Sequence, residues 1–282
     1  MAYTTLKLES EGQVSLLTLN RPEKRNAISP EMIEELGAAL DEVDRSPARV
    51  LILTGAGKAF CAGMDLAVLK ALAEQHPGQH HDHDILKEGP LKGGIPRASD
   101  ANLAESRRIA RMFRQIYEFS KPTIAAVNGP AIAGGCGIAT LCDITLATPE
   151  AKFGYTEVKI GFMPALVAVF LIRQIGEKRA RDLLLTGRVF DADQALRLGL
   201  VNEVVPEERL MSRAREFAGT LLEASPTSLV YTKRLLRKFT ADELDRELEL
   251  ALQENARIRS TFDFHEGLTA FLEKRKPAWR GE

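Results

Sequence analysis

Residues 123–137 read Thr-Ile-Ala-Ala-Val-Asn-Gly-Pro-Ala-Ile-Ala-Gly-Gly-Cys-Gly, and the rest of the chain can be interpreted around them. The apolar first part predicts a buried strand, and Asn128-Gly129-Pro130 predicts the turn that ends it. The small residues that follow predict a helix whose first turn contains Gly134 and Gly135. A helix N-terminus presents unpaired N–H groups and glycine allows close approach, so this corner can hold an anion or a carbonyl oxygen that becomes negative during a reaction. A glycine-mediated crossing of a helix and a strand would explain the same residues.

A second stretch, residues 50–66, repeats this order of features: Val-Leu-Ile-Leu-Thr-Gly-Ala-Gly-Lys-Ala-Phe-Cys-Ala-Gly-Met-Asp-Leu. An aliphatic strand runs into a glycine turn, and Gly63 stands just before the start of a predicted helix. Two such corners can each supply one N–H group to a single oxygen atom. The pair therefore favours a site that stabilises an anion.

With these two segments the chain resembles the crotonase superfamily, which contains enoyl-CoA hydratases and isomerases. The resemblance implies an α/β fold, a spiral of β-β-α turns, followed by C-terminal helices that make trimer contacts. It covers nearly the whole chain, and the motifs occur in the family's order and spacing. The matching residues are 54–66 and 127–143, Leu19-Asn20-Arg21-Pro22, Asn26-Ala27, Phe271-Leu272-Glu273-Lys274-Arg275 and Pro277.

The pattern along the chain predicts two parts. Apolar or alternating residues at 3–8 and 13–19 predict a β-hairpin, and strands separated by single helices predict a parallel sheet. From Pro206 onward the pattern is helical. The pattern predicts an α/β core in residues 1–205 and a helical region in residues 206–282. The resemblance implies that the core holds the acyl-CoA site and that the helical region serves oligomerisation.

Helix starts can be predicted at three places. Ser29 followed by Pro30 is a hydroxyl cap with proline at the first helical position, and Ser225 followed by Pro226 repeats this order. Thr240-x-x-Glu243 matches a capping box. Residues 70–102 lack a sustained period and are expected to form a mobile surface loop. The histidines among residues 75–84 have no evident scaffold to fix them, so we expect no metal site there.

Composition excludes several classes of protein. The 282 residues are 45% hydrophobic with a formal net charge of -1, which is typical of a soluble globular protein and gives no field that favours nucleic acid or a membrane surface. Cys61, Cys136 and Cys142 lie in apolar surroundings without a Cys-x-x-Cys pair, and we interpret them as reduced thiols that fill space. No signal-peptide core or membrane-length apolar run is present, so we expect a cytoplasmic location.

The resemblance implies a role for individual residues around an acyl-CoA thioester. The backbone N–H groups of Met64 and Gly134 would hold the thioester oxygen as it gains enolate charge. Ala62, Asp65 and Leu66 would contact the adenine and pantetheine of coenzyme A through the backbone. Because main-chain donors make up the oxyanion hole, a methionine at position 64 is no objection to this assignment.

Further residues would bind the coenzyme A portion. Lys24 and Arg25 form an adjacent pair of cations in a polar loop that lies beside the CoA phosphates in this family, although such a pair is usually only solvated. Phe271 and Lys274 would reach the CoA site of a neighbouring subunit in a trimer or a dimer of trimers. Apolar positions such as Leu235 and Leu236 also predict such an assembly. Leu248, Leu250 and Leu272 belong to the same apolar set.

The acid–base residues depart from the pattern of the well-known hydratases, which carry two glutamates. The first position is Gly137 here, and the second is Glu157 in Phe153-Gly154-Tyr155-Thr156-Glu157. Glu157 is expected to be at least partly buried, which raises the pKa of a carboxyl group towards the range of a general base. We expect the glycine at position 137 to leave room for a water molecule.

A single glutamate leaves more than one activity open. Glu157 can activate water for addition to a 2-enoyl-CoA, or it can carry a proton from C2 to C4 and isomerise a 3-enoyl-CoA. Segment 156–165 resembles single-glutamate hydratases, so hydration is the main prediction and isomerisation the alternative. A non-catalytic acyl-CoA-binding protein is a further alternative. One branch of the family binds AU-rich RNA, but the near-zero charge here argues against nucleic acid. We expect no cofactor other than coenzyme A as part of the substrate.

Overall fold

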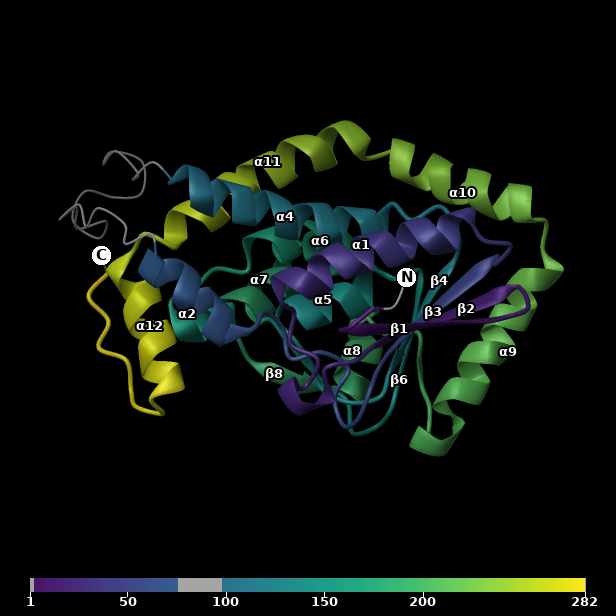
Figure 1. Ribbon diagram of the computed structural model, residues 1–282, viewed down its shortest axis with the longest axis horizontal. Coiled ribbons are helices and arrows are strands. Elements are labelled where there is room, and N and C mark those ends of the chain that lie inside the picture. The colour runs from purple at the N-terminus through teal and green to yellow at the C-terminus, as the bar shows by residue number, and fades with distance from the viewer. Residues whose placement is uncertain (1–2, 76–97, 282) are drawn as a thin grey trace.

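The computed structural model describes residues 3–75 and 98–281 (Figure 1). Its strands are β1 (Leu6–Glu11), β2 (Val14–Leu19), β3 (Val50–Gly55), β4 (Thr123–Val127), β5 (Ala131–Ile132), β6 (Ile144–Ala147), β7 (Lys152–Gly154), β8 (Val189–Asp191) and β9 (Glu203–Val204). Its α-helices are α1 (Pro30–Arg45), α2 (Leu66–Gln75), α4 (Asp100–Tyr117), α5 (Gly134–Leu141), α6 (Ala165–Ile175), α7 (Glu177–Thr186), α8 (Ala192–Leu198), α9 (Leu210–Glu223), α10 (Pro226–Lys238), α11 (Ala241–Ile258) and α12 (Phe262–Leu272). Short 3-10 helices are η1 (Pro22–Lys24), η2 (Glu157–Ile160) and η3 (Glu207–Arg209).

The main sheet has the order β1-β2-β3-β4-β6-β9. The hairpin β1–β2 is antiparallel, as predicted, and every later pair is parallel. The register places Leu53 beside both Leu17 and Ala125, so the carboxyl ends of β2, β3 and β4 share one edge of the sheet. Both glycine corners begin at this edge.

Both faces of the sheet are buried, which explains the unbroken apolar runs of β3 and β4. Leu51 and Leu53 of β3 pack into the large core that contains residues of α1, α4 and α5. Val50 and Ile52 point to the opposite face, where they pack against Leu210, Ala214 and Ala218 of α9. Figure 1 shows α9 lying against that face of the sheet, and α1 and α4 on the other side.

A small second sheet, of order β5-β7-β8, supports the two corners. Strand β5 follows the turn after β4 and pairs in parallel with β7, which pairs in antiparallel with β8. The chain therefore passes from the main sheet at β4 to the second sheet at β5 before α5 begins. This arrangement, together with the covering helices, confirms the predicted α/β class.

The helix starts were predicted with mixed success. Oγ of Ser29 accepts a hydrogen bond from the amide of Met32 at 3.2 Å, so the cap of α1 is as predicted. Thr240 stands at the N-terminus of α11, but its side chain makes no capping hydrogen bond. The predicted capping box is therefore wrong, because Thr240 has φ −130° and ψ 11° in place of the extended conformation that capping residues adopt.

The prediction of an irregular loop over residues 70–102 also needs correction at its ends. Residues 70–75 continue α2, and α4 begins at Asp100 with Ser99 as its cap. Most of the histidine-rich run lies outside the described residues. The charged and polar residues of this region obscured the helical pattern at both ends.

The last helices run along the outside of the molecule. Figure 1 shows α10 and α11 spanning one edge, with α12 next to α2 at the far end from α9. Leu235 and Leu236 on α10 are exposed by 53% and 60%, and Leu250 and Phe271 are exposed as well. Leu248 is buried in the core, so it does not belong to the exposed apolar set in which we had placed it.

Candidate active site

The two glycine corners are joined directly. Cys61 and Ala131 form an isolated parallel bridge, and the amide of Ile132 donates to the carbonyl oxygen of Cys61 at 2.9 Å. A Cβ atom on Gly135 would lie only 2.2 Å from that same oxygen. Glycine at position 135 is therefore required for the approach of α5 to residues 61–63.

The backbone around Met64 leaves its amide free. Ile28 bonds to the residues on either side, because its amide donates to Gly63 O at 2.8 Å and its carbonyl accepts from the Asp65 amide at 2.9 Å. Gly134 is the first residue of α5, so its amide has no partner within the helix. Among residues 3–75 and 98–281, neither amide donates to another backbone or side-chain group.

These two free amides lie close together. A Cβ atom on Gly63 would stand 3.6 Å from the amide nitrogen of Gly134. Ala133, between β5 and α5, has φ 50°, a conformation that costs a non-glycine residue on the order of 1–3 kcal/mol. Its amide is held by the carbonyl of Gly154 at 2.7 Å. Strain at this position fixes the direction of the Gly134 amide and is typical of functional sites.

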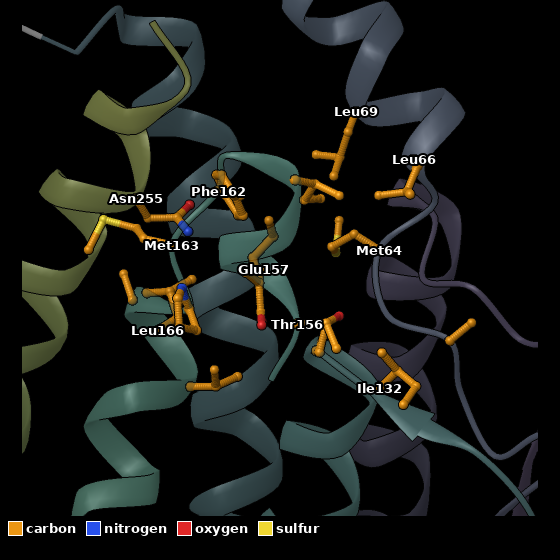
Figure 2. A pocket seen from close by; sticks show the side chains of 18 of the residues that line it. Met64, Leu66, Leu69, Ile132, Thr156, Glu157, Phe162, Met163, Leu166 and Asn255 are labelled. Carbon is orange, nitrogen blue, oxygen red and sulfur yellow. The ribbon is translucent and has the colours of Figure 1, made fainter. Parts of the chain in front are cut away.

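Glu157 lies in the same cavity as these amides. It begins η2, its side chain is 8% exposed, and its Oε2 atom has no hydrogen-bond partner. Burial raises its pKa from the ordinary 4.5 to about 7. Figure 2 shows the carboxyl group pointing into the cavity, with Met64 on one side and Leu166 on the other. The predicted burial of Glu157 is confirmed.

The cavity has a volume of about 160 Å³. A cavity of roughly this volume accepts a molecule of about six carbon atoms, such as benzene. Its wall is mostly apolar, with a few polar groups. The lining residues are Ala62, Met64, Leu66, Leu69, Ile109, Phe113, Ile132, Ala133, Gly134, Thr156, Glu157, Ile160, Phe162, Met163, Pro164, Ala165, Leu166, Val167, Asn255 and Phe271.

The predicted space at Gly137 is absent. A Cβ atom there would lie 2.7 Å from Cγ1 of Val167 and 3.0 Å from Cε1 of Phe113. Our expectation of room for a water molecule beside this glycine is therefore wrong. Two apolar side chains occupy the position at which a second glutamate would point.

The residues expected to contact coenzyme A divide into two groups. Ala62, Leu66 and Phe271 line the cavity, and Phe271 does so within its own chain. The carboxylate of Asp65 pairs with Arg21 at 3.0 Å and accepts from the amide of Ala67, so its side chain fixes the start of α2. The described lining residues do not include Lys24, Arg25 or Lys274, whose side chains are exposed.

The loop that carries Lys24 and Arg25 is fixed by Asn26. The buried Nδ2 atom of Asn26 donates to the carbonyl oxygens of Ala56, Ala59 and Phe60 at 2.8–3.2 Å. The carbonyl of Arg25 in turn accepts from the amide of Ala62 at 3.0 Å. The exposed cations are thus held next to the end of the cavity that contains Ala62.

Sequence reasoning missed the far wall of the cavity. Ile109 and Phe113 come from α4, Val167 from α6, and Asn255 from α11. Asn255 follows Leu248 and Leu252 at helical spacing on the buried side of α11. A polar residue in such an apolar stripe is a signal that could have identified it.

The remaining chemical groups give no second site among the described residues. Burial raises the pKa of the Cys61, Cys136 and Cys142 thiols to about 12, so they remain protonated. No group of three or more His, Cys, Asp or Glu side chains that could hold a metal ion occurs in the part of the chain that the structure describes. Within the same residues, no helix is both long and apolar enough to span a membrane.

Comparisons with known structures agree with this fold. A crystal structure of an enoyl-CoA hydratase/isomerase from Xanthobacter autotrophicus Py2 superposes with a TM-score of 0.81 at 31% identity, and the match covers 98% of this chain and 100% of the other. The sequence model of the enoyl-CoA hydratase/isomerase family matches residues 9–88 and 92–282. The chain therefore belongs to the enoyl-CoA hydratase/isomerase family, within the crotonase superfamily.

Individual relatives extend over nearly the whole chain. A Thermus thermophilus protein with a provisional enoyl-CoA hydratase name is 43% identical, covering 95% of this chain and 97% of the relative. Enoyl-CoA hydratase EchA19 of Mycobacterium tuberculosis is 39% identical, covering 96% and 94%. The short-chain-enoyl-CoA hydratase of Clostridium acetobutylicum is 33% identical, covering 98% and 97%.

Proposed function

We propose that this protein hydrates the double bond of a short-chain 2-enoyl-CoA thioester. The amides of Met64 and Gly134 bind the thioester oxygen, and Glu157 handles the proton. The observation that carries the proposal is that these two free N–H groups and a buried carboxyl group with an unpartnered Oε2 atom line one apolar cavity. The hydratase names of the relatives and the cavity volume of about 160 Å³ agree with a short acyl chain.

The reaction can proceed through the single carboxyl group. Ionised Glu157 takes a proton from water while the water oxygen bonds to C3, and the C2–C3 electron pair moves into an enolate whose oxygen lies against the two amides. Glu157 then returns the proton to C2, so one water is consumed and the carboxylate is restored. Preorganised donors of this kind contribute on the order of 3 kcal/mol each.

Residues outside the cavity support two further parts of the proposal, binding of the CoA portion and assembly into an oligomer. Lys24 and Arg25 stand as exposed cations near Ala62, where they can contact the CoA phosphates. The exposed leucines of α10 support a homo-oligomer, a trimer or a dimer of trimers, in which Lys274 reaches a neighbour. Coenzyme A takes part only as a portion of the substrate, and the proposed reaction needs no other cofactor. The proposed location of the protein is the cytoplasm.

Product mass tests this function. Purified protein is incubated with 2-butenoyl-CoA and 2-hexenoyl-CoA, and we expect loss of the conjugated thioester absorbance together with a gain of one water in mass. Proton transfer from C2 to C4 would instead convert a 3-enoyl-CoA at constant mass and increase the absorbance. Constant-mass conversion with no water uptake by any 2-enoyl-CoA would replace hydration by isomerisation. Tight binding of the esters with no turnover would leave a non-catalytic acyl-CoA-binding protein.

A further inference from the structure

Asn255 is a buried polar residue in the apolar wall of the cavity. It is 4% exposed and lies on α11. Figure 2 shows Asn255 across the cavity from Met64, with Glu157 between them. The acyl chain that extends from a thioester held at Met64 and passes Glu157 therefore continues towards the wall that contains Asn255.

Two neighbours determine which way the side-chain amide of Asn255 faces. The hydroxyl of Ser106 donates to Oδ1 at 2.8 Å, and Nη2 of Arg259 donates to the same oxygen at 3.4 Å. A guanidinium group can only donate hydrogen bonds, so the atom it contacts must be the oxygen. Both hydrogen bonds therefore go to the oxygen, and neither of these neighbours contacts the amide nitrogen Nδ2.

This Nδ2 group has no partner. No described residue accepts a hydrogen bond from it, and Asn255 lines the cavity. Unlike Oε2 of Glu157, Nδ2 is not fully enclosed by protein atoms, so an acceptor on a bound ligand can reach it. The two N–H bonds of Nδ2 thus make an unused donor site in a wall that otherwise consists of apolar groups such as Ile109 and Leu166.

A buried arginine, Arg259, lies behind Asn255. Arg259 is 4% exposed, its Nε atom has no partner, and its Cζ atom lies 5.4 Å from the ring centre of Phe162, which also lines the cavity. Glu105 is buried nearby but shares its carboxylate with Arg108 at 3.4 Å. Arg108 also pairs with Glu34 at 3.3 Å, so the charges of this cluster balance, and Arg259 is the cation in direct contact with Asn255.

We infer that Asn255 is a specificity-determining residue, which selects acyl-CoA esters whose acyl chain carries a hydrogen-bond-accepting oxygen beyond the reacting double bond. The inference rests on the proposed hydration of enoyl-CoA esters and names their chemical class. Nδ2 donates to a hydroxyl, carbonyl or carboxylate oxygen of the chain. An unsubstituted chain leaves this donor unpaired and binds less tightly.

Matched substrates test this preference. We compare 2-hexenoyl-CoA with its 6-hydroxy and 5-oxo derivatives, and we expect the wild-type kcat/KM to favour at least one oxygenated ester by about 10-fold or more. Asn255→Leu should remove this advantage, so that the ratio of kcat/KM for the oxygenated ester to kcat/KM for 2-hexenoyl-CoA falls about 10- to 100-fold. Ser106→Ala, which removes one of the two groups that orient the amide, should reduce the advantage by a smaller factor.

Binding gives a second measurement that does not depend on turnover. Saturated hexanoyl-CoA and 6-hydroxyhexanoyl-CoA are titrated against wild type, and the hydroxylated ester should bind more tightly. Equal or weaker wild-type activity and binding with every oxygenated ester would overturn the inference while leaving hydration of 2-hexenoyl-CoA intact. An equal loss of kcat for all substrates in Asn255→Leu would also overturn it, because Asn255 would then act in the chemistry. Failure to hydrate any ester would instead reject the proposed function, and the binding ratio would still decide the role of Asn255.

Discussion

Cγ1 of Val167 lies 2.7 Å from the point at which a Cβ atom on Gly137 would stand. The position that carries the first glutamate of two-glutamate hydratases is thus closed by packing. Among the described residues that line the cavity, Glu157 is the one with an ionisable side chain.

Substitution at Gly137 should therefore destabilise the protein. Gly137→Ala overpacks α5 against Val167 and Phe113, which typically costs about 1–3 kcal/mol, and Gly137→Glu should cost more without adding a working base. Thermal unfolding checks this, and adding Val167→Ala should recover part of the loss. Gly219→Ala on α9 is the control, since a Cβ atom there meets nothing within 4 Å and should be neutral or stabilising. Equal melting temperatures for Gly137→Ala and wild type would show that the neighbours move aside.

Glu157→Gln should separate catalysis from stability. Loss of the base should lower kcat by about 10²-fold or more, with acyl-CoA binding retained. The native-state pKa is raised from 4.5 to about 7, so the folded protein holds a proton that the unfolded chain releases, and stability falls as pH rises through this range. Above pH 7 this shift lowers the free energy of unfolding by roughly 3 kcal/mol. Glu157→Gln should therefore match wild type in melting temperature at pH 4.5 and exceed it by several degrees at pH 8. A difference in melting temperature between Glu157→Gln and wild type that stays the same at all pH values would contradict the raised pKa of Glu157.

Two adjacent substitutions test the main-chain oxyanion hole. Gly63→Ala places a Cβ atom 2.9 Å from Ile132 O at a residue with φ +87°, so it should shift the Met64 amide and lower kcat by about 10²-fold. Met64→Ala keeps the amide and removes only the side chain, so kcat should change by a few fold at most while acyl preference shifts. A larger loss of kcat in Met64→Ala than in Gly63→Ala would assign the effect to the side chain. Steady-state kinetics with 2-butenoyl-CoA provide the comparison.

The phosphate contacts should be visible as a salt-dependent KM. Replacing Lys24 and Arg25 together by alanine should raise KM for CoA esters several-fold at low ionic strength, with kcat unchanged, and the difference should shrink as salt is added. Arg45→Ala is the control, because Arg45 is an exposed cation at the other end of α1. An unchanged KM in the double variant at low salt would remove both residues from the CoA site.

The exposed leucines of α10 should hold the assembly together. Leu235→Glu with Leu236→Glu puts two charges on an apolar surface, which should shift the mass measured by light scattering from an oligomer to a monomer. Leu185→Glu on α7 is the matched control, since Leu185 is 74% exposed and lies on another helix. A wild-type protein that is already monomeric at micromolar concentration would refute the predicted oligomer.

Much of the fold could be predicted because its strands and turns produce local patterns of apolar residues and glycines in the sequence. The hairpin, the buried strands β3 and β4 and the start of α5 follow from apolar runs and glycine turns that the sequence shows directly. Strand β8 was missed because three residues, only one of them buried, give no period. The ends of the 70–102 segment were missed because charged residues can lie on an exposed helix as easily as in a loop.

The residues of the site also include some that could be predicted from the sequence and some that could not. The resemblance to the crotonase superfamily led to the prediction of Met64, Gly134 and Glu157, because each lies in a short segment that matches a motif of the family. Asn255, Phe113 and Val167 reach the cavity from helices far apart in the chain, and only the packing of α4, α6 and α11 brings them together. The close packing of Val167 and Phe113 against Gly137 could not be predicted for the same reason, because the presence of a glycine in the sequence does not show which side chains surround it.

Asn26 has a consequence for the thermodynamics of ligand binding. Because its single side chain ties residues 21–27 to the carbonyls of Ala56, Ala59 and Phe60, this loop loses its conformational entropy when the chain folds. If Lys24 and Arg25 contact the CoA phosphates as proposed, an incoming ester meets a loop that is already ordered, and binding does not cost the conformational entropy of this loop.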